Sequence, residues 1–102
     1  MEFGLSEQTC ATIRKILDQH PMIEKAVIYG SRAKGNYKNG SDIDLTLMGN
    51  ALDYKTLSAV AWALDESLIP YTVDLSLFEK IESPALREHI ERVGKVFYER
   101  ES

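Results

Sequence analysis

The sequence predicts an α/β (α+β) fold, in which a small mixed sheet carries helices mainly on one face and leaves the other face open. Short strand-like runs alternate with segments whose apolar residues recur at helical spacing. The predicted order is helix, strand, helix, strand, helix, strand, helix, followed by a last apolar segment. With 102 residues the chain can build one core and is too short for a second substrate-binding domain, so we expect a single domain over residues 1–102.

The first helix is predicted to begin after Ser6, which can accept a hydrogen bond from a first-turn amide, and to end near Gln19, before Pro21. Its apolar stripe consists of Cys10, Ile13, Ile16 and Leu17. Cys10 is the only cysteine, which excludes an intrachain disulfide and a cysteine-based zinc site. We expect this thiol to be buried and inert.

Residues 25–29 predict a strand that ends at Gly30, and a short helix is expected from Ser31 to Lys34 before Gly35 interrupts it. A glycine at the strand end lets a phosphate group approach the backbone closely. A helix that begins there directs its free N–H groups, together with the Ser31 hydroxyl, towards that anion. The segment 32–41 contains Arg32, Lys34 and Lys38 and no acidic residue, which suits a triphosphate.

Two later runs alternate apolar and polar residues and predict strands over residues 43–48 and 71–77. Asp42 and Asp44 would share the polar face of the first strand, and Asp74 would lie on the polar face of the second. If the strands are neighbours with matched faces, three carboxylates converge and repel one another unless a cation lies among them. Mg²⁺, which prefers oxygen ligands, fits such a site.

A third helix is expected after Asp53 as its N-cap and before Pro70. Its apolar repeat is Tyr54, Leu57, Ala61, Leu64 and Leu68. Trp62 lies off this stripe, so it is either half-exposed and available to a partner or part of the core.

The last helix is predicted from Ser83 and Pro84, as N-cap and first turn, to Gly94. Its inward-facing residues are Leu86, Ile90 and Val93. The apolar segment 96–98 is either an edge strand or a tail that docks elsewhere. The histidines are expected to be non-catalytic: His20 would interact with a helix dipole, and His89 would be structural or at a partner surface.

The composition is that of an ordinary globular protein, with 44% hydrophobic and 27% charged residues and a net charge of −4. This acidity argues against a dedicated nucleic-acid binder, although the local basic segment leaves a small RNA acceptor open. The N-terminus lacks the basic and apolar regions of a signal peptide, and no apolar run has transmembrane length. We therefore expect a cytoplasmic protein without membrane contact.

Simple structural explanations exist for single features of this pattern. Asp42 follows Asn39-Gly40, where an aspartate is ordinary turn chemistry, and Ser31 alone could be a helix cap. Asp44 is harder to explain in this way, because aspartate is disfavoured inside strands. The combination of all these features with Asp74 favours a nucleotide site.

The string Gly30-Ser31, ten residues, Asp42-x-Asp44, with Asp74 on a later strand, resembles the signature of the polymerase-beta-like nucleotidyltransferase superfamily. The fuller sequence resembles the minimal, MNT-type branch, and the resemblance covers nearly the whole chain. It implies the polymerase-beta-like fold and the transfer of a nucleoside monophosphate, with AMP from ATP as the expected case, to a hydroxyl with release of pyrophosphate.

The same resemblance implies a role for each residue. Asp42 and Asp44 would bridge two Mg²⁺ ions, and Asp74 would hold the second ion and accept the hydroxyl proton. Ser31 and the backbone around Gly30 would bind the terminal phosphates. The remaining implied phosphate contacts are Arg32 and Lys34.

Minimal members of this branch resemble antitoxins that pair with helical HEPN ribonuclease toxins, and some adenylylate a tyrosine of the toxin. The resemblance therefore implies a protein acceptor and an antitoxin function. Two alternatives stay open. The chain could neutralise its partner by contact without catalysis, or it could transfer a nucleotide to RNA or a small molecule in a pocket formed at an oligomer interface.

Overall fold

The computed structural model describes residues 2–38 and 40–101, and the order of elements is the predicted one. The elements are α1 (Glu7–Asp18), β1 (Lys25–Tyr29), α2 (Ser31–Lys34), β2 (Ile43–Met48), α3 (Tyr54–Glu66), β3 (Val73–Leu77), the 3₁₀ turn η1 (Phe78–Lys80), α4 (Pro84–Val93) and β4 (Lys95–Glu99). The last apolar segment is therefore a strand.

The three longer helices begin at the predicted caps. The side chains of Ser6, Asp53 and Ser83 each accept a hydrogen bond from the backbone N–H three residues later. Gly94 ends α4 with a φ of −65°, so it is not a left-handed cap. A side chain there would collide with the Ile90 carbonyl and lie 2.6 Å from Val27 Cγ1, which explains the glycine by close packing.

The four strands form one mixed sheet in the order β3-β2-β1-β4. Strand β1 runs antiparallel to both β2 and β4, whereas β2 and β3 are parallel. The register places Asp44 beside Asp74 on one side and beside Tyr29 on the other. Because side chains of paired residues share a face, these three residues project from the same face of the sheet.

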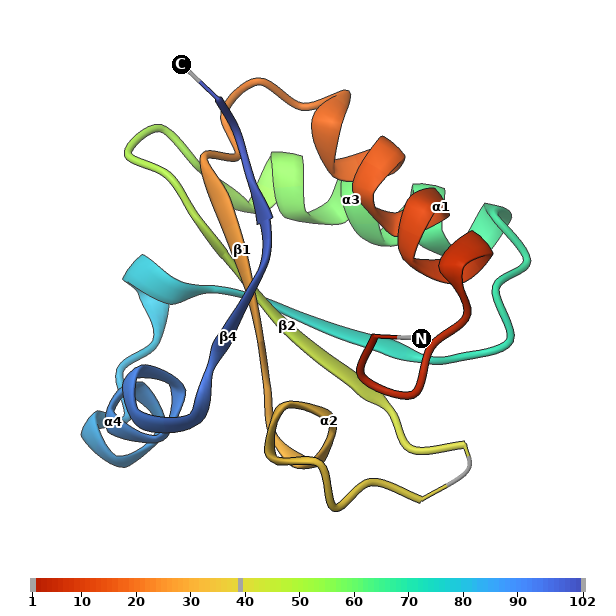
Figure 1. The fold of residues 1–102 in the computed structure, drawn as a ribbon. Helices are drawn as coiled ribbons and strands as arrows, with labels where there is room; N and C mark the ends of the chain where they lie inside the picture. Colours follow the sequence, from red (N-terminus) through yellow and green to blue (C-terminus); the bar gives the residue numbers. More distant parts are fainter. Residues whose placement is uncertain (1, 39, 102) are drawn as a thin grey trace.

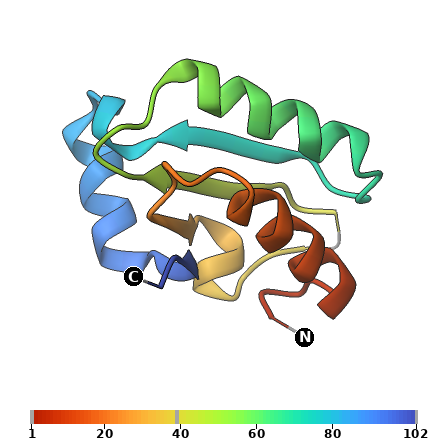
Figure 2. The same ribbon diagram turned by 90° about the horizontal axis from the view of Figure 1, so that it is seen from above.

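Helices α1 and α3 lie side by side on one face of the sheet and α4 lies on the other (Figures 1 and 2). The main core, between the sheet and the first two helices, includes Ile13, Leu17, Ile28, Leu45, Leu47, Val60 and Leu64. A smaller cluster forms where Ile90 of α4 packs with Val27 and Tyr29 of β1. The face expected to be open is therefore partly covered, and on β2 and β3 it is accessible at Asp44 and Asp74.

The predicted apolar stripe of α3 is wrong in part. Tyr54 and Leu68 are 59% and 88% exposed, and Ala61 is exposed as well. Leu64 is buried and Leu57 is partly buried in the core, as predicted, but the other fully buried residue of the helix is Val60, which was not in the predicted stripe. The sheet therefore contacts a line of residues next to the predicted one. Leu68 lies beyond the helix end. Trp62 is 68% exposed, which resolves the alternatives for this residue in favour of the surface.

None of the helices in the described ranges is both long and apolar enough to cross a membrane.

Candidate active site

The carboxylates of Asp44 and Asp74 lie on neighbouring parallel strands, in direct register and on one face, as the sequence predicts. Asp44 is half-buried, and Asp42, just before β2, and Asp74 are exposed. The pKa of Asp44 is raised, first by burial and then by the negative charges of Asp74 and Asp42. The three carboxylates therefore repel one another across a short range, and a cation would relieve this repulsion.

The carboxylates do not form a complete cage for a metal ion. Among residues 2–38 and 40–101, no three His, Cys, Asp or Glu side chains form a group that could hold a metal by itself. Mg²⁺ usually takes one or two carboxylates and completes its shell with substrate phosphates and water. An all-oxygen pair such as Asp44 and Asp74, with mutual repulsion to relieve, therefore fits Mg²⁺ that arrives with a nucleotide.

Gly30 brings the two halves of the sequence motif into contact. Its φ of +75° and ψ of −152° belong to a region that residues with a side chain rarely adopt. A Cβ atom at this position would collide with Oδ2 of Asp44. The turn after β1 can therefore lie against the carboxylate only because residue 30 is glycine.

Ser31 is the first residue of the short helix α2 and is half-buried. The cap position belongs to Gly30, so the explanation of Ser31 as a helix N-cap does not apply. The first-turn amides of a helix have no intrahelical acceptor, and the Gly30 cap of α2 lies against the Asp44 carboxylate. Lys34, at the end of α2, is exposed and free to reach a bound anion.

Arg32 does not lie where a phosphate contact requires it. Its side chain is only 3% exposed. Nε and Nη2 donate to the Ser41 carbonyl at 3.0 and 2.8 Å, and Nη1 donates to the Phe3 carbonyl at 2.8 Å. The expected phosphate contact is therefore replaced by a structural one, because neighbouring carbonyls take up the guanidinium.

Two residues beside the carboxylates were not predicted as part of the site. Tyr29 is 9% exposed, and burial, with smaller effects of Asp44 and Asp74, raises its pKa. His89 of α4 packs edge-on against the Tyr29 ring, with the ring centroids 6.3 Å apart. The interaction with His89 lowers the pKa of Asp44, whereas burial, which is the larger effect, raises it. The only sequence signals were the alternation that puts Tyr29 on the aspartate face and the helical spacing of His89 from Leu86.

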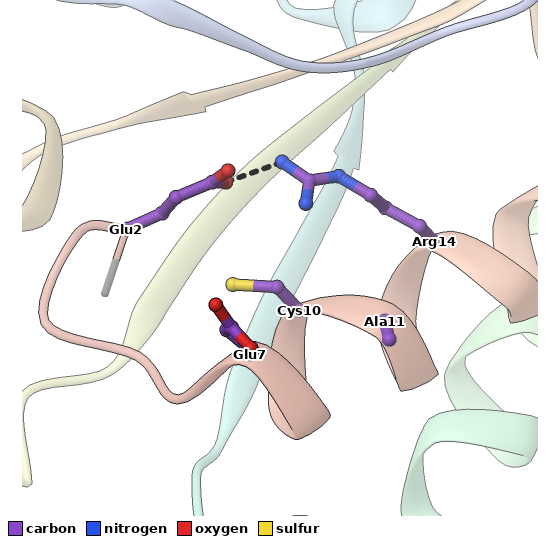
Figure 3. A pocket seen from close by; sticks show the side chains of 5 residues that line it. All are labelled: Glu2, Glu7, Cys10, Ala11 and Arg14. Atoms are coloured by element: carbon purple, nitrogen blue, oxygen red, sulfur yellow. Dashed lines mark hydrogen bonds and ion pairs between the residues drawn. The ribbon is translucent and has the colours of Figure 1, made fainter.

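A pocket between the N-terminal turn and α1 is separate from this site (Figure 3). It is lined by Glu2, Glu7, Cys10, Ala11 and Arg14, and none of these is a predicted site residue. Cys10 is 3% exposed, and burial is the main reason that its pKa is raised. The thiol is therefore buried, as predicted, and its burial favours the protonated, less reactive form.

Residues 11–102 match the family described as "Polymerase beta, Nucleotidyltransferase". A Haemophilus influenzae protein named "Probable protein adenylyltransferase MntA" is 32% identical over 101 residues, which cover 98% of this chain and 88% of that protein. A chain in a solved toxin–antitoxin complex with AMP-PNP superposes with a TM-score of 0.70 at 23% identity, over 95% of this chain and 76% of that one. A complex of a tri-AMPylated Shewanella oneidensis HEPN toxin with an MNT antitoxin gives a TM-score of 0.69 at 22% identity, over 94% and 74%. At these identities the two solved structures show the shared fold.

Proposed function

The chain belongs to the polymerase beta nucleotidyltransferase family, and we propose that it transfers AMP from ATP to a hydroxyl group of a partner protein. The observation that carries this proposal is the contact between the Gly30-Ser31 turn and the Asp44 carboxylate, with Asp74 in register beside it. This contact supports an anion-binding turn and a metal-binding carboxylate pair that act together on one nucleotide.

Each residue at this point has a separate part in the reaction. Ser31 and the backbone at Gly30 bind the triphosphate, and Lys34 adds a positive charge. Asp44 and Asp74, with the exposed Asp42 just before β2, would hold Mg²⁺, which would supply charge neutralisation for the nucleotide. Asp74 is exposed, so an acceptor hydroxyl can reach it and give up its proton there. The hydroxyl oxygen forms a bond to the α-phosphorus, the bond to the bridging oxygen of the β-phosphate breaks, and pyrophosphate leaves.

We propose that the acceptor is a HEPN-type ribonuclease toxin and that this chain is its antitoxin. The name of the Haemophilus relative and the AMPylated toxin in the Shewanella complex support this partner. Residues 1–102 act in this proposal as one minimal nucleotidyltransferase domain. ATP as donor places the reaction in the cytoplasm.

Intact-mass spectrometry tests this function. The co-purifying partner is measured before and after incubation with ATP and Mg²⁺, in parallel with the Asp74→Asn variant. We expect the partner to gain one or more AMP units with the unsubstituted protein and none with the variant. A stably bound partner that gains no mass would favour neutralisation by contact, and label found only in extracted RNA or metabolites would favour a different acceptor.

A further inference from the structure

Arg32 connects three segments of the chain that are separate in sequence. Two nitrogens of its guanidinium donate hydrogen bonds to the Ser41 carbonyl, and the third donates to the Phe3 carbonyl. At 3% exposure the side chain has little contact with solvent. A buried guanidinium is costly unless its donors are satisfied, and here each of the three side-chain nitrogens has an acceptor.

Aromatic rings hold the guanidinium in place. Its carbon Cζ lies 5.1 Å from the ring centroid of Tyr37 and 4.8 Å from that of Tyr71. Both distances are within the range of a cation–π contact. The Tyr37 ring in turn packs on Gly4, since a Cβ atom there would overlap it. The N-terminal turn therefore supports the segment that follows α2 (Figure 1).

The positions of these contacts in the sequence give Arg32 a specific role. Arg32 directly follows the phosphate-binding Ser31, and Ser41 directly precedes Asp42. One side chain therefore ties together the two ends of the ten-residue segment between Ser31 and Asp42. We propose that Arg32 is a positioning residue that fixes the Ser41–Asp42 peptide relative to the Ser31 turn and so sets where the Asp42 carboxylate meets the nucleotide-bound Mg²⁺. This inference rests on the proposed function.

Lysine cannot replace arginine in this arrangement. The planar guanidinium donates two bonds to one carbonyl and a third to another while its faces contact aromatic rings. An ammonium group is a point donor on a flexible stem and can keep at most part of this set. Arg32→Lys thus preserves the charge and removes the fixed geometry.

The test measures the affinity for ATP by calorimetry, once with Mg²⁺ and once with EDTA. The dissociation constant in EDTA divided by the one in Mg²⁺ is a ratio that reports the Mg²⁺-dependent part of binding. Loss of a side chain that orients a metal ligand typically lowers metal affinity about 10–100-fold. We expect Arg32→Lys to reduce the ratio by about tenfold or more and to leave the affinity in EDTA nearly unchanged.

Arg100→Lys is the matched control. Arg100 also donates to three carbonyl oxygens, those of Asp18, His20 and Ile23, and it contacts the Tyr98 ring. None of these is a predicted site residue, so this variant should lose stability without changing the ratio. An equal change of the ratio in both variants would overturn the proposal, because it would show a general loss of structure.

A double-mutant cycle with Asp42→Asn decides whether Arg32 acts through Asp42. We expect Arg32→Lys to have no further effect on the ratio once Asp42 is asparagine. Two results would overturn the positioning role. Either Arg32→Lys lowers the ratio by the full amount when residue 42 is asparagine, or it does not lower the ratio when residue 42 is aspartate. If Arg32→Lys does not fold, Tyr37→Ala removes one wall of the same cluster, and an unchanged ratio there would equally overturn it. A ratio insensitive to Asp42→Asn alone would overturn the proposed site itself.

Discussion

Replacement of Gly30 by alanine should destabilise the protein more than its backbone conformation alone explains. The φ of +75° and ψ of −152° are accessible to glycine and strained for alanine. Residues held in sparsely populated backbone regions cost about 1–3 kcal/mol each. The new methyl group would in addition collide with Oδ2 of Asp44, so the carboxylate must move.

These terms give a measurable shift. For a domain of this size, a loss of 1 kcal/mol lowers the Tm by roughly 4–8 °C. The backbone strain of Gly30→Ala alone therefore predicts a decrease of at least about 4 °C in thermal unfolding. Gly35→Ala is the control, because Gly35 has a φ of +87° but nothing within 4 Å of an added Cβ atom. We expect Gly30→Ala to lose more stability than Gly35→Ala.

The contact with Asp44 is tested by a double-mutant cycle. After Asp44→Ala the nearest remaining atom, Cβ, would lie 3.7 Å from the new methyl group, which is an ordinary contact. Gly30→Ala should therefore cost less in the Asp44→Ala background, with a coupling of about 0.5–3 kcal/mol, as for residues in contact. Additive losses, or equal losses for the Gly30 and Gly35 variants, would show that the Gly-Ser turn does not lie against this carboxylate.

Three further predictions concern charge, phosphate binding and the exposed helix face. The folded-state pKa of Asp44 is raised, so the free energy of unfolding without metal should fall as pH rises from the unfolded-state pKa through the folded-state pKa. Asp44→Asn should remove this pH dependence. If the Asp44→Asn variant were less stable than the unsubstituted protein in urea unfolding with EDTA at neutral pH, this prediction would be contradicted. Ser31→Ala should raise the KM for ATP about 10–150-fold, because a hydrogen bond to a charged group contributes about 1.5–3 kcal/mol. An unchanged KM in steady-state kinetics would exclude Ser31 from phosphate binding. Trp62→Ala should change the free energy of unfolding by less than about 0.5 kcal/mol, because the side chain is 68% exposed; a larger loss in urea unfolding would show hidden packing.

Local sequence patterns predicted most of the fold. The caps at Ser6, Asp53 and Ser83 and the alternation in the strands depend on neighbouring residues, so they can be read from the sequence. The pairing of Asp44 with Asp74 required only the further assumption that two strands are neighbours with matched faces, and the parallel register satisfies it.

Other features depend on tertiary contacts that no local pattern contains. A four-residue helix does not determine where Arg32 points, and its acceptors at Phe3 and Ser41 lie 29 and 9 residues away. The position of α4 on the aspartate face, which brings His89 to Tyr29, depends equally on long-range packing. In α3, apolar residues occupy more than one line of the helix, so the sequence could not show which line the sheet would bury.

The central claim is that the carboxylate site transfers a nucleotidyl group, and labelled ATP tests it most directly. The complex with the co-purifying partner is incubated with Mg²⁺ and ATP labelled at either the α- or the γ-phosphorus. We expect the α-label to become covalently bound to the partner and the γ-label to leave as pyrophosphate, with neither label retained on the partner in the Asp74→Asn variant. Retention of the γ-label on the partner, or equal α-labelling by the variant, would contradict it.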